Sequence, residues 1–418
     1  MDIKKNTLYQ LLNLGFAGVS MLFFTIVIAR ILGTKAFGLY SYVFTYAGVF
    51  GIFYDFGLDV TLTKKVAVDK GETNIIGQLL FLKSITCGFT FLFYFLLGYL
   101  ILRISLSLLI LAGLGVLAAS FISFGCAYFR GIERLDYEAL FGILQKFIFI
   151  PLAILTAIKL EVEGIFASLT STNLLILMMI YVFLRRREVN INIKPYNFSE
   201  TFDIFRKEAL PLFFIALFTF LYFRIDMLML KWFKGEEVVG VYAASYRLME
   251  GFTLFPSALM AALFPRLAYY ASVDKNSFIT YFSKGLILLS TLAALLFLLS
   301  LIFGKKFVLL LYGPNYRASC SLFIWLMAAL SLIYPNFILT QSIIAINQQY
   351  IYALVSFIAF IANIALNLLL IPKYSATGAA ISTIFTELIL GLSLAIVLFT
   401  TLRQLHKVNP SPEESKIK

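Results

Sequence analysis

The chain is built from apolar runs of about 20 residues separated by short polar gaps. Folded as an α-helix, which rises about 1.5 Å per residue, such a run crosses the roughly 30 Å hydrocarbon core of a bilayer. Hydrophobic residues make up 61% of the chain and charged residues only 13%, an excess that a water-facing surface cannot hide. The sequence therefore predicts an all-α polytopic membrane protein.

Scanning the chain with this window predicts about twelve transmembrane helices. In the first half they are Leu11–Ile31, Gly38–Val60, Leu79–Leu102, Leu106–Tyr128, Ala139–Ile158 and Ile165–Leu184. In the second half they are Leu210–Phe233, Val241–Phe264, Phe278–Phe303, Leu322–Ile344, Ile351–Ile371 and Gly378–Phe399. The first run is too long for the apolar region of a signal peptide, so we expect it to remain as a span.

The Lys and Arg residues predict the orientation. With the N-terminus inside, 21 of the 34 fall on cytoplasmic segments, 10 on external segments and three deeper inside spans. Positive residues favour the cytoplasmic side, where the anionic headgroups of membrane lipids attract them. We expect a multi-pass protein of the plasma membrane with both termini in the cytoplasm.

The longest interruption, residues 185–209, predicts a division into two lobes. It opens with three arginines, and from Ser199 it has the pattern of a short interfacial helix with Phe202 and Phe205 on one face. This cytoplasmic linker would separate a six-helix lobe at 1–184 from a second at 210–402. A polar tail at 403–418 would follow the second lobe.

A short internal echo indicates that the two lobes share a fold. Phe37-Gly38-Leu39-Tyr40-Ser41 opens the second span, and Val239-Gly240-Val241-Tyr242-Ala243 opens the eighth, 202 positions later. Because six is even, both lobes enter from the same side of the membrane. The repeat predicts a pseudo-two-fold axis along the membrane normal, with the transport path between the lobes.

Charges inside spans mark the candidate site, because each costs several kcal/mol unless it meets a partner or a watery cavity. At about 1.5 Å per residue, Arg224 lies roughly 13 Å and Arg247 roughly 9–12 Å from the outer surface. Intramolecular pairing is one interpretation, since Arg247 and Glu250 share a helical face. A polar cavity with cationic anchors is the other, because Arg binds phosphate bidentately. The candidate substrate-binding residues are Arg224, Arg247, Lys146, Asp226, Glu250 and Glu387.

Two further acidic residues, Asp55 and Asp59, lie near the cytoplasmic end of the second span. We expect them to pair with Lys64 and Lys65, which follow directly.

Several function classes are disfavoured. The net charge of +12 sits in the gaps between spans, which indicates contact with lipid headgroups and not with nucleic acid. Three scattered cysteines and one histidine form neither a disulfide set nor a metal site. No nucleotide-binding, zinc-protease, hydrolase or dinucleotide motif is present, and no external loop exceeds roughly twenty residues. We therefore expect a protein that is not an enzyme and that uses no cofactor.

The C-terminal motif resembles a known family. Asn363-Ile-Ala-Leu-Asn367 leads to Ile371-Pro372-Lys-Tyr374 and then to Gly378-Ala-Ala380, with Glu387 following. Smaller matching pieces occur in the expected order along the chain: Arg30-Ile-Leu-Gly33, Asp55-Phe-Gly57-Leu58, Arg224-Ile-Asp226 and Tyr312-Gly313-Pro314. Together they resemble the oligosaccharide flippases (Wzx-like) of the multidrug/oligosaccharidyl-lipid/polysaccharide exporter superfamily. One departure is Ser375, where a glycine is usual after the tyrosine.

The resemblance implies twelve spans in two lobes that open alternately to each side of the membrane. It implies a polyprenyl-diphosphate-linked oligosaccharide as cargo, with the sugar in the cavity and the prenyl tail in lipid. Cavity arginines bind the diphosphate in relatives, and motif position assigns this role to Arg224. H⁺ or Na⁺ as a coupling cation and polysaccharide assembly proteins are possible further partners.

Two alternatives remain open at the level of the sequence. An organic-cation or multidrug exporter of the same superfamily should have an acidic, aromatic cavity, whereas here Lys146, Arg224 and Arg247 lie at depth. A non-transporting scaffold in an envelope-assembly complex is the third class, and deletion would then leave no phenotype linked to a cargo.

The orientation can be tested with reporter fusions. We expect reporters placed after Leu184 and at the C-terminal tail near Asn409 to report cytoplasm, because the positive charge is concentrated there. An external signal at either position would contradict the division into two blocks of six spans.

Overall fold

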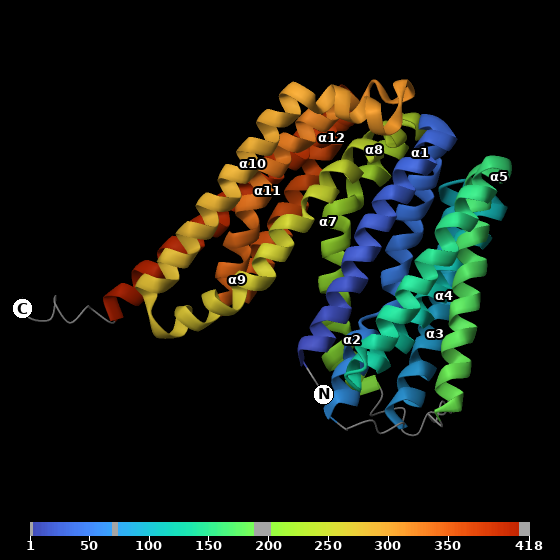
Figure 1. Cartoon of the computed structure of the whole chain (residues 1–418), viewed down its shortest axis with the longest axis horizontal. Helices are drawn as coiled ribbons and strands as arrows, with labels where there is room; N and C mark the ends of the chain where they lie inside the picture. The colour runs from blue at the N-terminus through green and yellow to red at the C-terminus, as the bar shows by residue number, and fades with distance from the viewer. Residues whose placement is uncertain (1–2, 69–73, 188–201, 409–418) are drawn as a thin grey trace, which may run out of the picture. The chain divides into compact units, whose positions relative to one another are not determined.

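The structure is a computed structural model that describes residues 3–68, 74–187 and 202–408. Throughout these ranges the regular structure is helical, and nine helices are long and apolar enough to cross a membrane. The chain divides into two compact units, Met1–Lys231 and Trp232–Lys418. Figure 1 shows the order of the helices in each.

The first unit holds helices α1 to α5 and all of α7 except its last three residues. Their bounds are α1 Ile3–Asp55, α2 Leu58–Val68, α3 Asn74–Leu96, the π-helical η1 Leu97–Ile101, α4 Leu106–Gly131, α5 Leu135–Arg186, the π-helical η2 Phe205–Ala209 and α7 Leu210–Lys234. The second unit holds α8 Glu236–Phe252, α9 Leu254–Val273, α10 Lys275–Tyr312, the 3₁₀-helix η3 Pro314–Tyr316, α11 Ser319–Ala345 and α12 Gln349–Val408.

Three of the helices, with 53, 52 and 60 residues, are well over twice as long as the roughly 20 residues that a span requires, and each contains a break in helical geometry. The breaks are at Gly33 in α1, Glu161 in α5 and Ser375 in α12. All three fall in predicted gaps between consecutive spans. The all-α membrane fold is confirmed, and the count of twelve spans stays a prediction.

The backbone repeats at equivalent places in the two halves. Gly33 has φ 69° and ψ 178°, and Gly235, 202 positions later, has φ 87° and ψ −177°. This is the same offset as the sequence echo that begins at Phe37 and Val239. A left-handed φ of this kind favours glycine, so both turns require that residue.

A second repeat, with an offset of 214, surrounds the other two breaks. Gly164 and Gly378 each follow a positive-φ residue by three positions, after Glu161 and Ser375. A Cβ atom on Gly164 would lie 2.6 Å from the carbonyl oxygen of Thr156, and one on Gly378 would lie 2.3 Å from that of Leu370. Only glycine lets the returning helix approach this closely.

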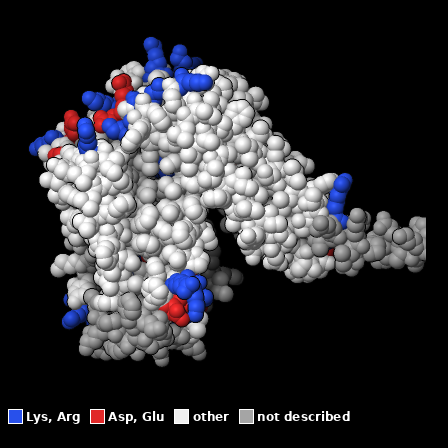
Figure 2. Space-filling model, turned by 180° about the vertical axis from the view of Figure 1, so that it is seen from behind, with Lys and Arg blue, Asp and Glu red and all other residues white. Residues whose placement is uncertain are grey.

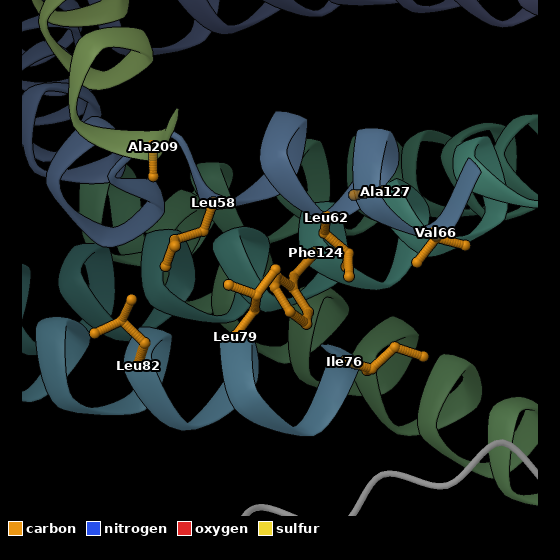
Figure 3. Packing of buried hydrophobic residues seen from close by; sticks show 9 residues of the cluster. All are labelled: Leu58, Leu62, Val66, Ile76, Leu79, Leu82, Phe124, Ala127 and Ala209. Carbon is orange, nitrogen blue, oxygen red and sulfur yellow. The ribbon is translucent and has the colours of Figure 1, made fainter. Parts of the chain in front are cut away.

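The first unit has a buried apolar cluster where α2 packs against α3, α4 and the residue just before α7. Figure 3 shows its members: Leu58, Leu62, Val66, Ile76, Leu79, Leu82, Phe124, Ala127 and Ala209. Fully burying such a side chain stabilises a fold by roughly 1.5–3 kcal/mol against water, and tight van der Waals packing has this role in lipid.

Helix α7 belongs to the first unit in this division, although the sequence prediction begins a second lobe at Leu210. The ring of Phe213 stacks on Phe56 at 4.5 Å and meets Phe53 edge-on at 5.0 Å. The predicted end of the first lobe at residue 184 and the predicted start of the second lobe at residue 210 therefore stay predictions. Residues 188–201 of the linker, including Ser199, lie outside the described residues, whereas Phe202 and Phe205 form the expected pair, 6.3 Å apart.

In the second unit, α11 packs against α8, α9, α10 and α12. Hydroxyl groups connect it to α8: Ser245 donates to the carbonyl of Ser319 at 2.9 Å, and Ser319 donates to that of Val241 at 2.8 Å. At the start of α10, outside the spans, Asp274 accepts the backbone N–H groups of Asn276 and Ser277. Hydrogen bonding to Ser277, and then to Asn276, lowers the pKa of Asp274.

The exposed surface fits a lipid environment. On the face in Figure 2, charged side chains form a few groups, and broad uncharged surface lies between them. Many large apolar side chains are exposed, including Phe89, Trp232 and Leu310 at 69–73%. A water-soluble monomer rarely exposes so much apolar area, so the chain is a multi-pass membrane protein.

Replacing Ser375 by glycine should stabilise the protein. Ser375 has φ 55° and ψ −138°, a conformation that costs a non-glycine residue about 1–3 kcal/mol. We expect Ser375→Gly to raise the thermal unfolding midpoint in detergent by about 2 °C. The neighbouring helical Ala376→Gly is the control, and it should lower the midpoint because glycine is a poor helix former. A lower midpoint for Ser375→Gly would contradict the strained turn.

Candidate functional site

Both units contribute predicted site residues. Lys146, Arg224 and Asp226 belong to the first unit, and Arg247, Glu250 and Glu387 to the second. At about 1.5 Å per residue, Arg224 and Arg247 each lie roughly 17 Å along their own helix from Gly235. Measured from Gly235, both residues therefore lie deep in a hydrocarbon core about 30 Å thick.

Lys146 lies in the middle of the first half of α5 and is partly buried. Its Nζ donates to Oε1 of Gln145 at 3.3 Å. Gln145 in turn donates to Asn173 at 2.7 Å, and Asn173 donates to the carbonyl of Gly115 at 2.8 Å. Among the described side chains, no carboxylate lies within 4.0 Å of this ammonium group. Lys146 is thus a membrane-depth cation whose contact here is a neutral amide.

Arg224 and Asp226 lie on α7 with different degrees of exposure. Arg224 is partly buried, whereas Asp226 is only 5% exposed. Oδ1 of Asp226 accepts the backbone N–H of Met227 at 2.8 Å. The carboxylate of Asp226 therefore has a local hydrogen-bond donor of its own.

Arg247 and Glu250 form the ion pair that their spacing on α8 predicts. Nη1 of Arg247 lies 2.9 Å from Oε2 of Glu250, and about three tenths of each side chain is exposed. The intramolecular interpretation is therefore correct for this contact. The pair uses one nitrogen of a guanidinium that carries five N–H donors.

Glu387 lies on α12 and is 4% exposed. Its Oε2 accepts Nδ2 of Asn336 at 2.8 Å, and the same amide nitrogen lies 2.9 Å from the Glu387 carbonyl oxygen. The preceding residue, Thr386, accepts a hydrogen bond from Asn363 at 3.3 Å, and Asn363 accepts one from Asn367 at 2.9 Å. These side chains form a buried polar belt between α11 and the two halves of α12.

A buried ionic cluster in the first unit is absent from the predicted site. Lys83 on α3 has no exposed side-chain surface, and its Nζ lies 2.9 Å from Asp59 and 3.5 Å from Asp55. Its ammonium also lies 5.2 Å from the centre of the Phe124 ring. A buried ammonium or carboxylate group without a counter-ion would be very costly, so Lys83 and the two aspartates stabilise one another.

The predicted pairing of Asp55 and Asp59 with Lys64 and Lys65 is wrong. Those two lysines instead contact Glu208 in η2, at 3.1 and 2.8 Å. The cause is the turn between α1 and α2, where Phe56 and Gly57 have positive φ. Asp55 caps this turn by accepting the N–H groups of Gly57 and Asp59, which directs both carboxylates toward α3.

The sequence of the chain matches a known protein family. The family described as "Polysaccharide biosynthesis protein" matches residues 3–271. The chain is 26% identical to the membrane protein MJ1375 of Methanocaldococcus jannaschii, over 93% of this chain and 96% of that protein. It is 26% identical to the probable flippase AglR of Haloferax volcanii, over 64% of this chain and 56% of AglR. The probable low-salt glycan biosynthesis flippase Agl15 of the same organism is 21% identical, over 92% of this chain and 80% of Agl15.

Solved transporter structures share the fold. A MATE family multidrug transporter of the MOP superfamily, in its inward-facing conformation, gives a TM-score of 0.75 at 13% identity, over 94% of this chain and 99% of that one. The lipid II flippase MurJ gives 0.69 at 17% identity, over 94% and 87%. At these identities the likeness establishes the fold and not the cargo.

Removing the central cation of the ionic cluster should destabilise the protein. Lys83→Met would leave two carboxylates with no counter-ion in an apolar environment, which costs about 3–5 kcal/mol. We expect a large fall in folded membrane protein, measured by fluorescence-detected size-exclusion chromatography, and partial recovery when Asp59→Asn is added. Lys64→Met is the control, because that side chain is 68% exposed and its loss should cost less than about 1 kcal/mol. Normal abundance of Lys83→Met would show that the cluster is not structural.

Proposed function

Because the chain belongs to the polysaccharide biosynthesis protein family, we propose that it is a flippase for a lipid-linked oligosaccharide. In this proposal it moves a polyprenyl-diphosphate-linked oligosaccharide from the cytoplasmic to the outer leaflet by alternating access. The cargo supplies cell-surface glycan or polysaccharide assembly.

The main support for this proposal is the environment of Lys146. Its ammonium lies in the middle of an apolar helix and contacts the neutral amide of Gln145. A cation at this depth is costly unless it meets an anion or water for part of its working cycle. A diphosphate supplies that anion.

Arg224 and Arg247 extend the same chemistry. A guanidinium grips phosphate oxygens with two parallel hydrogen bonds, whereas an ammonium acts as a point charge. Arg247 keeps donors beyond the one that contacts Glu250. We assign these two residues and Lys146 to the diphosphate, and the acidic residues Asp226, Glu250 and Glu387 to the polar surroundings of the cargo.

The relatives support a transporter and not an enzyme. AglR and Agl15 are named as flippases, and MurJ is a lipid II flippase. The likeness to MATE transporters favours an organic-cation exporter as the second candidate, because that fold also serves multidrug export. A membrane-depth cation such as Lys146 is unfavourable for a cationic drug, which places the flippase first.

A reconstituted flipping assay tests the function. Purified protein in vesicles should expose a fluorescent polyprenyl-diphosphate oligosaccharide to a quenching reagent outside, and should not transport an organic cation dye. A proton or sodium gradient imposed on the same vesicles tests the proposed coupling cation. Transport in vesicles that hold no other protein would show that polysaccharide assembly proteins, if partners, are not required for flipping.

Variants of the cations test their assignment. A charge-assisted hydrogen bond contributes about 1.5–3 kcal/mol, so Lys146→Met and Arg224→Ala should each lower flipping roughly 10- to 100-fold while the protein remains inserted. Arg224→Lys should have an intermediate effect because it keeps charge and loses bidentate geometry. Lys159→Met is the control, an exposed lysine on the same helix as Lys146. Full flipping by well-expressed Lys146→Met and Arg224→Ala proteins would remove both residues from the site.

A further inference from the structure

We propose that an apolar groove in the second unit holds part of the prenyl chain of the cargo, an inference that rests on the proposed function. The groove has a volume of about 560 Å³. It lies where the end of α8 and the start of α9 meet α10 and α11. The family resemblance alone leaves the prenyl tail in lipid, so a protein groove for the chain is a distinct claim.

The groove forms at the break between α8 and α9. Helix α8 ends at Phe252, and α9 begins at Leu254. Carbonyl groups released by such a break must be satisfied, because lipid offers no hydrogen bonds. Thr253 donates its hydroxyl to the carbonyl of Glu250 at 2.7 Å, and the buried Tyr334 of α11 donates to that of Phe252 at 2.8 Å. These two hydrogen bonds stabilise the break and satisfy the carbonyl oxygens of Glu250 and Phe252.

The walls of the groove suit a hydrocarbon chain. Phe252 and Phe255 line one side, and Leu292 and Leu295 of α10 line the other. The hydroxyl of Tyr334 is turned to the backbone, which leaves its ring as lining. Pockets of roughly 300–1,000 Å³ accommodate ligands of useful affinity, so the volume is large enough for several branched carbon units.

The positive charge of Arg247, close to the groove, favours an amphiphilic ligand with an anionic head group. Arg247 precedes the lining residue Gly251 by four positions, and residues at this spacing lie on one face of a helix. The guanidinium contacts Glu250 through one nitrogen and retains other donors. A chain in the groove would therefore place an attached diphosphate within reach of Arg247.

The depth of Arg247 in the membrane distinguishes the cargo from an ordinary phospholipid as the occupant of the groove. Arg247 lies twelve residues beyond Gly235, about 18 Å along α8. The phosphate of a resting phospholipid stays at the interface, whereas the diphosphate of a lipid that crosses the membrane must pass this depth. The juxtaposition of groove and arginine therefore fits the prenyl cargo as the occupant.

Photocrosslinking tests the occupant. A benzoylphenylalanine replaces Leu295, which lines the groove and is 50% exposed, in the full-length protein reconstituted in phosphatidylglycerol vesicles. The matched control replaces Leu298, which is 55% exposed on the same helix and is not part of the lining. The probe is radiolabelled polyprenyl diphosphate. We expect at least several-fold more label at position 295, and we expect unlabelled polyprenyl diphosphate to compete it away.

A bulky side chain that fills the groove should weaken the binding of cargo with a long prenyl chain. Thr291→Trp places a large ring in the groove, whereas Ala294→Trp places the same ring on exposed surface of α10 outside the lining. We expect Thr291→Trp to raise the KM for long-chain cargo about tenfold, the effect of losing one or two buried methylene groups, with kcat nearly unchanged. The KM for a cargo with a short prenyl chain should change little.

Equal labelling at positions 295 and 298, or label that phosphatidylglycerol displaces as well as polyprenyl diphosphate does, would overturn the groove proposal. A KM for long-chain cargo that is the same in both tryptophan variants would do so too. These outcomes leave the flippase function intact if the wild-type protein still flips its cargo. Failure of the wild-type protein to flip any lipid-linked oligosaccharide would instead refute the proposed function.

Discussion

Lipid offers a protein backbone no hydrogen-bond partners, and this constraint governs where the helices of this chain can stop. A helix that ends within the membrane exposes carbonyl groups, so each end needs a local donor. At the α8–α9 break, Thr253 and Tyr334 are those donors. Between predicted spans, at Gly33 and Gly235, the chain turns through a left-handed conformation that glycine adopts without strain. The α8–α9 break, and the groove beside it, therefore depend on side chains that satisfy the backbone carbonyl groups.

The same low dielectric decides which charges the interior tolerates. Lys83 is fully buried because Asp59 and Asp55 lie beside it, and Glu387 is buried because Asn336 donates to its carboxylate. In both cases a neighbouring side chain compensates the buried charge. Lys146 differs, since its contact is the neutral amide of Gln145. A charge with weaker internal compensation is more available to an external ligand, and for that reason Lys146 is the cation best suited to the anionic cargo proposed above.

The sequence predicts the helical fold well because apolar length and glycine positions are local properties. The break sites at Gly33, Glu161 and Ser375 fall in the predicted gaps, and the echo at Phe37 and Val239 follows equivalent turns. The ionic contacts were harder to predict because they depend on helix rotation and on distant partners. Lys64 contacts Glu208, 144 positions away, and Lys83 lies near the end of a predicted span, where it resembles an ordinary interfacial cation. Hydropathy gives the depth of a residue and not the direction of its side chain.

The internal repeat shows which residues on equivalent helical faces are alike in the two units and which one differs. With an offset of 214, Gly164, Ser168 and Thr172 correspond to Gly378, Ser382 and Thr386, and all six are small or polar residues spaced by four along one helical face. Ser168, Thr172, Ser382 and Thr386 are at most 2% exposed, as a face in close contact with another helix should be. The next position in each half is Asn173 in the first unit and Glu387 in the second, and both are buried and hydrogen-bonded. Close packing has thus kept the same face in both halves, whereas the ionisable carboxylate occurs in only one of the two corresponding positions.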